Sequence, residues 1–227
     1  MFEDFTRGYW GNRPSKPFVH LAESGRSALY LAAKRGFDIA AVVLASPLIL
    51  LLIGALALLV RRDGGPAFYC QPRLGKKGRI FLLWKLRSMV PDADARLARH
   101  LSDDPAAAAE WAKAQKLRAD PRITAPGRWL RKYSLDELPQ LWNVLIGDMS
   151  LVGPRPMFPE QQVLYPGSAY FDFRPGLTGL WQISKRNQCS FAERADFDNR
   201  YAQTASFGGD LGILAQTVSV VLRGTGY

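Results

Sequence analysis

An apolar stretch from Ile39 to Val60 constrains the fold of this chain more than any other feature of its sequence. Its 22 residues contain no charged side chain. A helix of this length rises about 33 Å, which is enough to cross a bilayer core of about 30 Å. A single transmembrane helix is therefore one interpretation of the stretch.

Ser46 and Pro47 interrupt this stretch. Proline lacks an amide hydrogen and its ring clashes with the preceding turn, so it kinks or breaks a helix. In lipid the freed carbonyl needs a new partner, and the Ser46 hydroxyl is well placed to donate to it. Lys34-Arg35 precedes the stretch and Arg61-Arg62 follows it, so basic residues indicate no crossing direction. A re-entrant hairpin and a kinked span both agree with these residues.

The chain is strongly basic, with 30 Lys and Arg against 20 Asp and Glu. Such a charge favours anionic partners, which include acidic lipids, nucleic acid and phosphorylated substrates. Residues 61–87 alone hold eight Lys or Arg and one acid, Asp63. Because juxtamembrane basic clusters attract anionic lipid, we expect most of these side chains to face lipid headgroups.

The rest of the sequence predicts an α-rich α+β body. The segment Gly75-Lys76-Lys77-Gly78 is typical of a hairpin turn between strands at 67–74 and 79–84. Residues 153–179 are rich in proline and glycine, which favours rigid loops that hold side chains over a site. Helices are expected at 92–118, facing solvent, at 128–146, interrupted at Pro139, and at 211–222, in the core or at the membrane interface.

Two adjacent carboxylates, Asp136 and Glu137, are the strongest candidates for chemistry. Ser134 and Glu137 together also fit a helix capping box, a purely structural explanation. That helix would contain Pro139 in its interior, so we expect a kink beside the carboxylates instead. Neighbouring helical residues point about 100° apart, so one carboxylate could attack phosphorus while the other holds a divalent metal. Phosphoryl transfer requires such a nucleophile, with Mg²⁺ and arginine to neutralise charge.

Arg155 and Arg174 are candidates for phosphate binding, because each lies next to proline in the loop region. The planar guanidinium group suits bidentate contacts with phosphate. A lone arginine in a loop is usually a solvated charge, but two arginines in proline-braced loops near a candidate phosphoryl site favour a role in binding.

These residues resemble the bacterial sugar transferase family, the monotopic phosphoglycosyl transferases that begin glycan assembly on polyprenol phosphate. The resemblance runs from about Lys34 to Tyr227, and the chain is most similar to members that initiate exopolysaccharide synthesis. It rests on a series of motifs in a common order: Lys34-Arg35 with Asp38, Ser46-Pro47, Gly65-Pro66 with Gln71-x-Arg73, Lys85-Leu-Arg87-Ser-Met89, Ser134-Leu-Asp-Glu-Leu-Pro-Gln-Leu, Gly153-Pro-Arg-Pro156, Arg174-Pro-Gly-Leu-Thr-Gly-Leu-Trp-Gln182 and Asp198-x-x-Tyr201.

The resemblance implies transfer of a hexose-1-phosphate, from UDP-galactose or UDP-glucose, to polyprenol (undecaprenyl) phosphate with release of UMP. This would be the first membrane step of exopolysaccharide biosynthesis. Asp136 would be the nucleophile that forms a phosphosugar–aspartyl intermediate, and Glu137 would bind Mg²⁺. The phosphate and substrate contacts would come from Arg87, Arg155, Arg174 and Asp198.

The resemblance also favours the re-entrant hairpin, with both ends cytosolic at the bacterial inner membrane. We expect an N-terminal lead-in at 1–33, a re-entrant helix at 34–60 and a small catalytic domain with interfacial helices at 61–227. The resemblance implies the small catalytic form of the family. The expected partners are the UDP-sugar, polyprenol phosphate and membrane lipids, without nucleic acid. The sequence indicates no oligomeric state.

The alternative is a membrane-tethered basic protein that binds anionic lipid or nucleic acid without catalysis.

Overall fold

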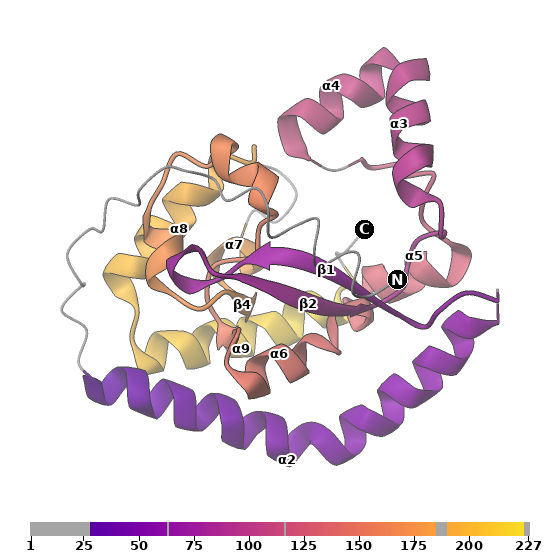
Figure 1. Cartoon of the computed structure of the whole chain (residues 1–227). Helices are drawn as coiled ribbons and strands as arrows, with labels where there is room; N and C mark the ends of the chain where they lie inside the picture. Colours follow the sequence, from indigo (N-terminus) through magenta and orange to yellow (C-terminus); the bar gives the residue numbers. More distant parts are fainter. Residues whose placement is uncertain (1–27, 63, 116, 185–189, 225–227) are drawn as a thin grey trace.

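The computed structural model describes residues 28–62, 64–115, 117–184 and 190–224. These residues form a helix-rich α+β body with one long helix along its edge, as predicted (Figure 1). The predicted lead-in falls mostly outside the described residues, and the long helix begins within it. The elements are α2 (Ala28–Arg61), β1 (Phe68–Leu74), β2 (Ile80–Leu86), α3 (Ala93–Asp103), α4 (Pro105–Ala114), α5 (Ala125–Lys132), α6 (Gln140–Ile146), β3 (Ser150–Val152), β4 (Gly176–Thr178), α7 (Leu180–Ile183), α8 (Arg194–Thr204) and α9 (Phe207–Leu222), with 3₁₀ turns η1 (Lys76–Gly78), η2 (Leu135–Glu137), η3 (Pro159–Leu164) and η4 (Ala169–Asp172).

Helix α2 contains the apolar stretch and bends near its middle, so that its concave side faces the rest of the protein (Figure 1). It is long and apolar enough to cross a membrane, and most of its surface is exposed. Leu44, Leu48 and Leu51 are among the exposed side chains. An apolar surface of this size suits association with lipid rather than with water.

Ser46 and Pro47 act together in this helix. Pro47 has no amide hydrogen for the carbonyl of Val43, one turn earlier. The Ser46 hydroxyl donates to that same carbonyl at 2.8 Å, as predicted. The helix therefore continues through the proline as one bent element instead of breaking into two. Re-entrant insertion stays a prediction.

Both arms of α2 pack against the same folded body. Val42 of the first arm joins the main core, whereas Leu56 and Val60 of the second arm pack with Leu86 and Leu130. Burial of these apolar side chains, at about 25 cal/mol per Å², makes α2 part of the fold.

Lys34 and Arg35, expected only as a basic flank of the membrane segment, also fasten α2 to the body. Lys34 Nζ lies 2.7 Å from the Asp210 carboxylate of α9. Arg35 donates to the carbonyls of Val144 and Leu145 at 2.6 and 2.8 Å, in the last turn of α6. A cation at this end of a helix is favoured by the helix dipole.

The predicted hairpin is confirmed. Strands β1 and β2 pair antiparallel, with Phe68 opposite Leu86 and Leu74 opposite Ile80. The turn between them places Lys77 and Gly78 in the left-handed region, at φ 58° and 74°. Only glycine adopts that conformation freely, which explains Gly78.

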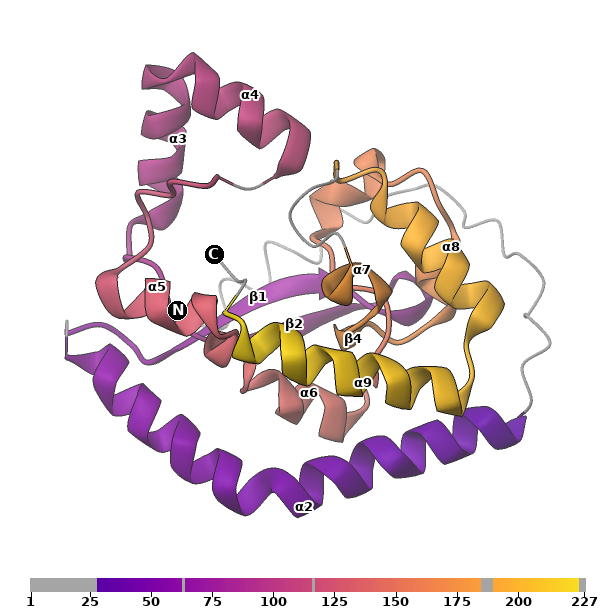
Figure 2. The same cartoon turned by 180° about the vertical axis from the view of Figure 1, so that it is seen from behind.

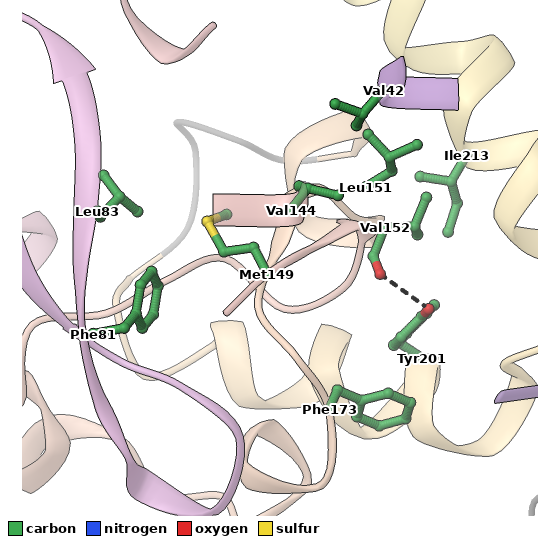
Figure 3. Packing of buried hydrophobic residues seen from close by; sticks show 10 residues of the cluster. All are labelled: Val42, Phe81, Leu83, Val144, Met149, Leu151, Val152, Phe173, Tyr201 and Ile213. Atoms are coloured by element: carbon green, nitrogen blue, oxygen red, sulfur yellow. Dashed lines mark hydrogen bonds between the residues drawn. The ribbon is translucent and has the colours of Figure 1, made fainter. Parts of the chain in front are cut away.

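A second pair of short strands, β3 and β4, was not predicted and lies at the centre of the body. These strands run parallel, with Ser150 opposite Gly176 and Val152 opposite Thr178. The main core surrounds them with side chains from both hairpin and helices. Figure 3 shows Phe81 and Leu83 of β2 facing Met149, with Val42 beside Leu151 on the other side.

Helices α3 and α4 project from the body as a separate arm (Figure 2). The prediction of one helix over 92–118 was wrong, because the chain turns at Asp104-Pro105. Asp104 caps α4 by accepting from the amides of Ala106 and Ala107 at 2.9 and 3.1 Å. Pro105 takes the first helical position, where its missing amide does no harm.

Candidate active site

The Asp136-Glu137 pair lies in η2, the tight turn that joins α5 to α6. The interruption of the predicted 128–146 helix therefore comes before Pro139. It occurs at Ser134, whose φ of 55° is left-handed. In this conformation Ser134 makes no capping hydrogen bond with the described turn 135–137, so the capping-box explanation is wrong. Pro139 instead sits at the N-cap of α6. The turn gives the two carboxylates different surroundings.

Glu137 is held between two cations. Lys85 Nζ of β2 lies 2.9 Å from Oε1, and Arg155 Nη2 lies 2.7 Å from the same oxygen. Arg155 Nη1 is 3.4 Å from the other oxygen, Oε2. Burial alone would raise the pKa of Glu137, but the charges of Arg155 and Lys85 outweigh it and hold that pKa well below its usual value. Glu137 is therefore a fixed carboxylate anion.

Asp136 has a contrasting environment although it is the adjacent residue. The residue is 4% exposed. The nearest cation is Lys85, whose Nζ lies 3.8 Å from Oδ2. Burial raises the pKa of Asp136 and the charge of Glu137 raises it further, whereas Lys85 acts to lower it. A weakly paired carboxylate suits attack on phosphorus better than one fixed by two strong hydrogen bonds. These surroundings favour Asp136 over Glu137 as the nucleophile, and that role stays a prediction.

Arg155 reaches the site from the loop after β3, and two glycines set the course of that loop. Gly153 packs against the backbone of Arg174 and Gly176, where a side chain would collide with a carbonyl. Gly176 is equally crowded by the backbone of Gly153. The Gly153-Pro-Arg-Pro156 and Pro175-Gly176 motifs therefore reflect a close crossing of two chain segments. This crossing fixes the loop that carries Arg155.

The other predicted site residues have separate surroundings. Asp198 of α8 is buried and accepts from the Tyr165 hydroxyl at 2.8 Å. Burial raises its pKa to about 6, although Arg194 and Tyr165 act to lower it. Arg174 is exposed, and its Nε donates to the Gly147 carbonyl at 2.8 Å, just after α6. Participation of Asp198 and Arg174 in a nucleotide-sugar pocket stays a prediction.

Arg87 is buried among backbone carbonyls. It donates to Pro66 at 2.7 Å, and to Met89 and Val60 at 3.3 Å each. Val60 belongs to the last turn of α2, so Arg87 ties the end of that helix to β2. A side chain on Gly65 would strike the guanidinium group, which explains that glycine. These contacts give Arg87 a structural role, and its contact with phosphate stays a prediction.

Comparison with known proteins supports the resemblance that these motifs suggested. A sequence model of bacterial sugar transferases matches residues 29–224. The chain belongs to the bacterial sugar transferase family.

Relatives with known names include undecaprenyl-phosphate galactose phosphotransferase of Salmonella typhimurium, 47% identical over 88% of this chain and 42% of its own length. The UDP-galactose-lipid carrier transferase of Erwinia amylovora is 46% identical over 85% of this chain and 41% of its own length. The chain thus spans about two fifths of these two relatives. The exopolysaccharide production protein ExoY of Rhizobium meliloti is 45% identical over 93% of this chain and 96% of its own length.

The carboxylate pair of this sugar transferase suits magnesium by its chemistry. Both side chains offer oxygen ligands, and Oε2 of Glu137 is held only by one long contact. The described residues contain no group of three or more His, Cys, Asp or Glu that could hold a metal. Glu137 could therefore bind Mg²⁺ only with further ligands from phosphate and water, which is the usual mode for this ion.

Sequence reasoning did not assign Lys85 to the site. Lys85 was grouped with the basic residues of 61–87 that were expected to face lipid headgroups, yet it contacts both carboxylates. Its motif, Lys85-Leu-Arg87-Ser-Met89, was the sequence feature that could have indicated a place in the site. The alternation of β2 turns Lys85 away from Leu86, which packs with Leu56, Val60 and Leu130.

Proposed function

We propose that this protein transfers a hexose-1-phosphate from a UDP-sugar to polyprenol phosphate and releases UMP, as the first membrane step of exopolysaccharide biosynthesis. The observation that carries the proposal is the buried Asp136-Glu137 pair, in which one carboxylate is fixed by Arg155 and Lys85 and the other is weakly paired. The names of the relatives support galactose as the sugar.

The reaction proceeds in two displacements. An Asp136 oxygen attacks the β-phosphorus of the donor, and the bond from that phosphorus to the bridging oxygen breaks, so UMP leaves with the electron pair. An oxygen of polyprenol phosphate then attacks the same phosphorus and returns Asp136 as a free carboxylate. Arg155 and Lys85 lie where they can stabilise negative charge on the transferring group. Mg²⁺ bound at Glu137 would supply further charge neutralisation.

The packing of α2 supports a re-entrant, monotopic association with the cytosolic face of the inner membrane. Both arms of the helix, at Val42 and at Val60, pack on one body. In a straight crossing of about 30 Å the two arms would leave the bilayer on opposite sides. A bent helix dipped into one leaflet keeps both arms in contact with the body.

The alternative of a basic binding protein without catalysis is not favoured by the structure. That reading requires the cations of residues 61–87 to face an external anion. Lys85 instead contacts two carboxylates, and Arg87 contacts three carbonyls. Lys85 therefore belongs to the candidate site, and Arg87 stabilises the fold.

The test uses the full chain in lipid nanodiscs with radiolabelled UDP-galactose or UDP-glucose and undecaprenyl phosphate. We expect release of UMP, a phosphosugar adduct on Asp136 by mass spectrometry, and exchange of labelled UMP into the UDP-sugar without acceptor. Asp136→Asn should abolish all three, whereas Asp94→Asn, at an exposed position on α3, should change none. UMP release with no adduct and no exchange would indicate direct attack by the lipid phosphate. Normal turnover of Asp136→Asn would disprove the nucleophile assignment.

A further inference from the structure

Three arginines from distant parts of the chain meet at residues 155–156. Arg194, at the start of α8, donates to the Arg155 carbonyl at 2.6 Å. The guanidinium carbons of Arg194 and Arg155 lie 5.0 and 5.9 Å from the centroid of a Trp181 ring. Arg73 of β1 is 3.4 Å from the carbonyl of Pro156, the residue after Arg155. The three side chains therefore converge on one short segment beside the carboxylate pair.

Two of these arginines make no ion pair with a carboxylate. Arg155 is paired with Glu137. Within the described part of the chain, neither Arg73 nor Arg194 has a carboxylate within the 4.0 Å of an ion pair. Asp198, one helical turn after Arg194, accepts from Tyr165, and its charge acts on Arg194 only from beyond that distance. The cluster thus carries more positive charge than its own carboxylates balance.

Arg194 is buried, whereas Arg73 is half-buried and also donates from Nη2 to Gln71 Oε1 at 3.0 Å. Arg194 is 7% exposed and lies against the ring of Phe191, 4.8 Å from its centroid. Arg73 lies 3.4 Å above the centroid of Phe158. Its Nε is buried without a hydrogen-bond partner among the residues that the structure describes. Burial, together with the charge of Arg155, lowers the pKa of Arg73 to about 9.

Such an arrangement is unfavourable in the protein alone. A buried charge normally requires a partner, and a buried donor normally requires an acceptor. The aromatic faces of Trp181, Phe158 and Phe191 compensate only in part, since a cation–π contact contributes about 0.5–2 kcal/mol. An anionic ligand between the guanidinium groups would supply both the negative charge and the acceptors.

We infer that Arg73 and Arg194, beside Arg155, form a subsite for the α-phosphate of the donor, the phosphate that leaves with UMP. The inference rests on the proposed function and deepens it: the substrate class is a nucleoside diphosphate sugar. The α-phosphate lies at Arg73 and Arg194, and the transferring β-phosphate lies between Arg155 and Asp136. When the bond between the β-phosphorus and the bridging oxygen breaks, the electron pair goes to the UMP phosphate. The two unpaired arginines stabilise that charge, and their planar groups suit its oxygens.

The first experiment measures binding alone. Isothermal titration of the full chain in nanodiscs uses UDP, UMP and inorganic pyrophosphate as probes. Arg194→Gln and Arg73→Gln should each weaken UDP binding about 10- to 100-fold, the effect of losing one charged hydrogen-bonding partner. Arg200→Gln, on an exposed position of the same helix, is the matched control and should change binding less than about 2-fold.

Because Arg194 also contacts the Arg155 carbonyl, Arg194→Gln could fail to fold. Arg194→Lys keeps the charge without the planar group, and we expect it to fold and to bind UDP with an intermediate loss. A purely structural role would lower the melting temperature and weaken UDP, UMP and pyrophosphate equally. A role in the subsite weakens UDP and UMP, which both carry the α-phosphate, and leaves the melting temperature unchanged.

The second experiment identifies which substrate carries the phosphate. In turnover assays Arg73→Gln should raise KM for the UDP-sugar about 10-fold or more and leave KM for undecaprenyl phosphate unchanged. A rise confined to the lipid acceptor would overturn the inference. So would unchanged UDP binding in both arginine variants, or no UDP binding by the unmodified protein. If the variants lose UDP binding but the unmodified protein releases no UMP from any UDP-sugar, the subsite stands and the proposed reaction fails.

Discussion

Asp210→Asn should loosen the attachment of α2 to the rest of the protein. Asp210 is buried in α9 and accepts from Tyr30 at 2.9 Å, from Lys34 at 2.7 Å and from Tyr201 at 2.8 Å. Asparagine keeps the shape but removes the charge that balances Lys34. Removing one partner of a buried ion pair typically costs about 3–5 kcal/mol, because the other charge is left uncompensated. We expect a loss of that size in the free energy of unfolding.

The assay is thermal and urea unfolding of the full chain in nanodiscs, followed by circular dichroism. For a chain of this size, a loss of 1 kcal/mol shifts the melting temperature about 2–4 °C, so the expected shift is about 6–20 °C. The double variant Lys34→Met with Asp210→Leu removes both charges and should be more stable than Asp210→Asn alone. A loss below about 1 kcal/mol for Asp210→Asn, with additive effects in the cycle, would refute the reasoning.

Three further predictions concern the site, the membrane helix and the projecting arm. Burial raises the pKa of Asp136, so the rate of adduct formation should fall as pH drops through that raised pKa and protonates the nucleophile. Lys85→Met removes a charge that lowers this pKa and should move the acid limb of the pH–rate profile to higher pH. Ser46→Ala leaves the Val43 carbonyl unpaired, and unfolding in nanodiscs should show a loss of about 0.5–2 kcal/mol; no change would contradict the bond. Asp104→Ala removes the cap of α4 and should cost about 1 kcal/mol locally, seen as faster hydrogen exchange in α4 with unchanged sugar transfer.

Features set by residues close in sequence could be predicted from the sequence. The turn at Gly75–Gly78 requires a left-handed backbone at Gly78, so the glycine in the sequence predicted the hairpin. The Ser46 hydroxyl and the carbonyl that Pro47 frees lie within one helical turn, so their hydrogen bond was also predictable. The carboxylate pair is local too, and its motif connected it to a known family.

Features that depend on distant pairing were missed. Lys85 and Glu137 are 52 positions apart, and charge alone does not indicate which of eight basic residues turns inward. Arg194 reaches Arg155 from 39 positions away. Strands β3 and β4 have three residues each, too few for a periodic pattern to show, and they pair across a long loop. The position of Ser134 in the left-handed region was missed because serine is uncommon there.

The packing of Leu56 and Val60 against Leu130 has a consequence for how this protein can be handled. Leu130 belongs to α5, which leads directly into the turn that carries Asp136. A shortened protein that starts after Arg61 would lack Leu56 and Val60. The apolar side chains of Leu86 and Leu130 would then be exposed to water. We therefore expect bilayer thickness and curvature to affect the geometry around Asp136 through the angle of α2.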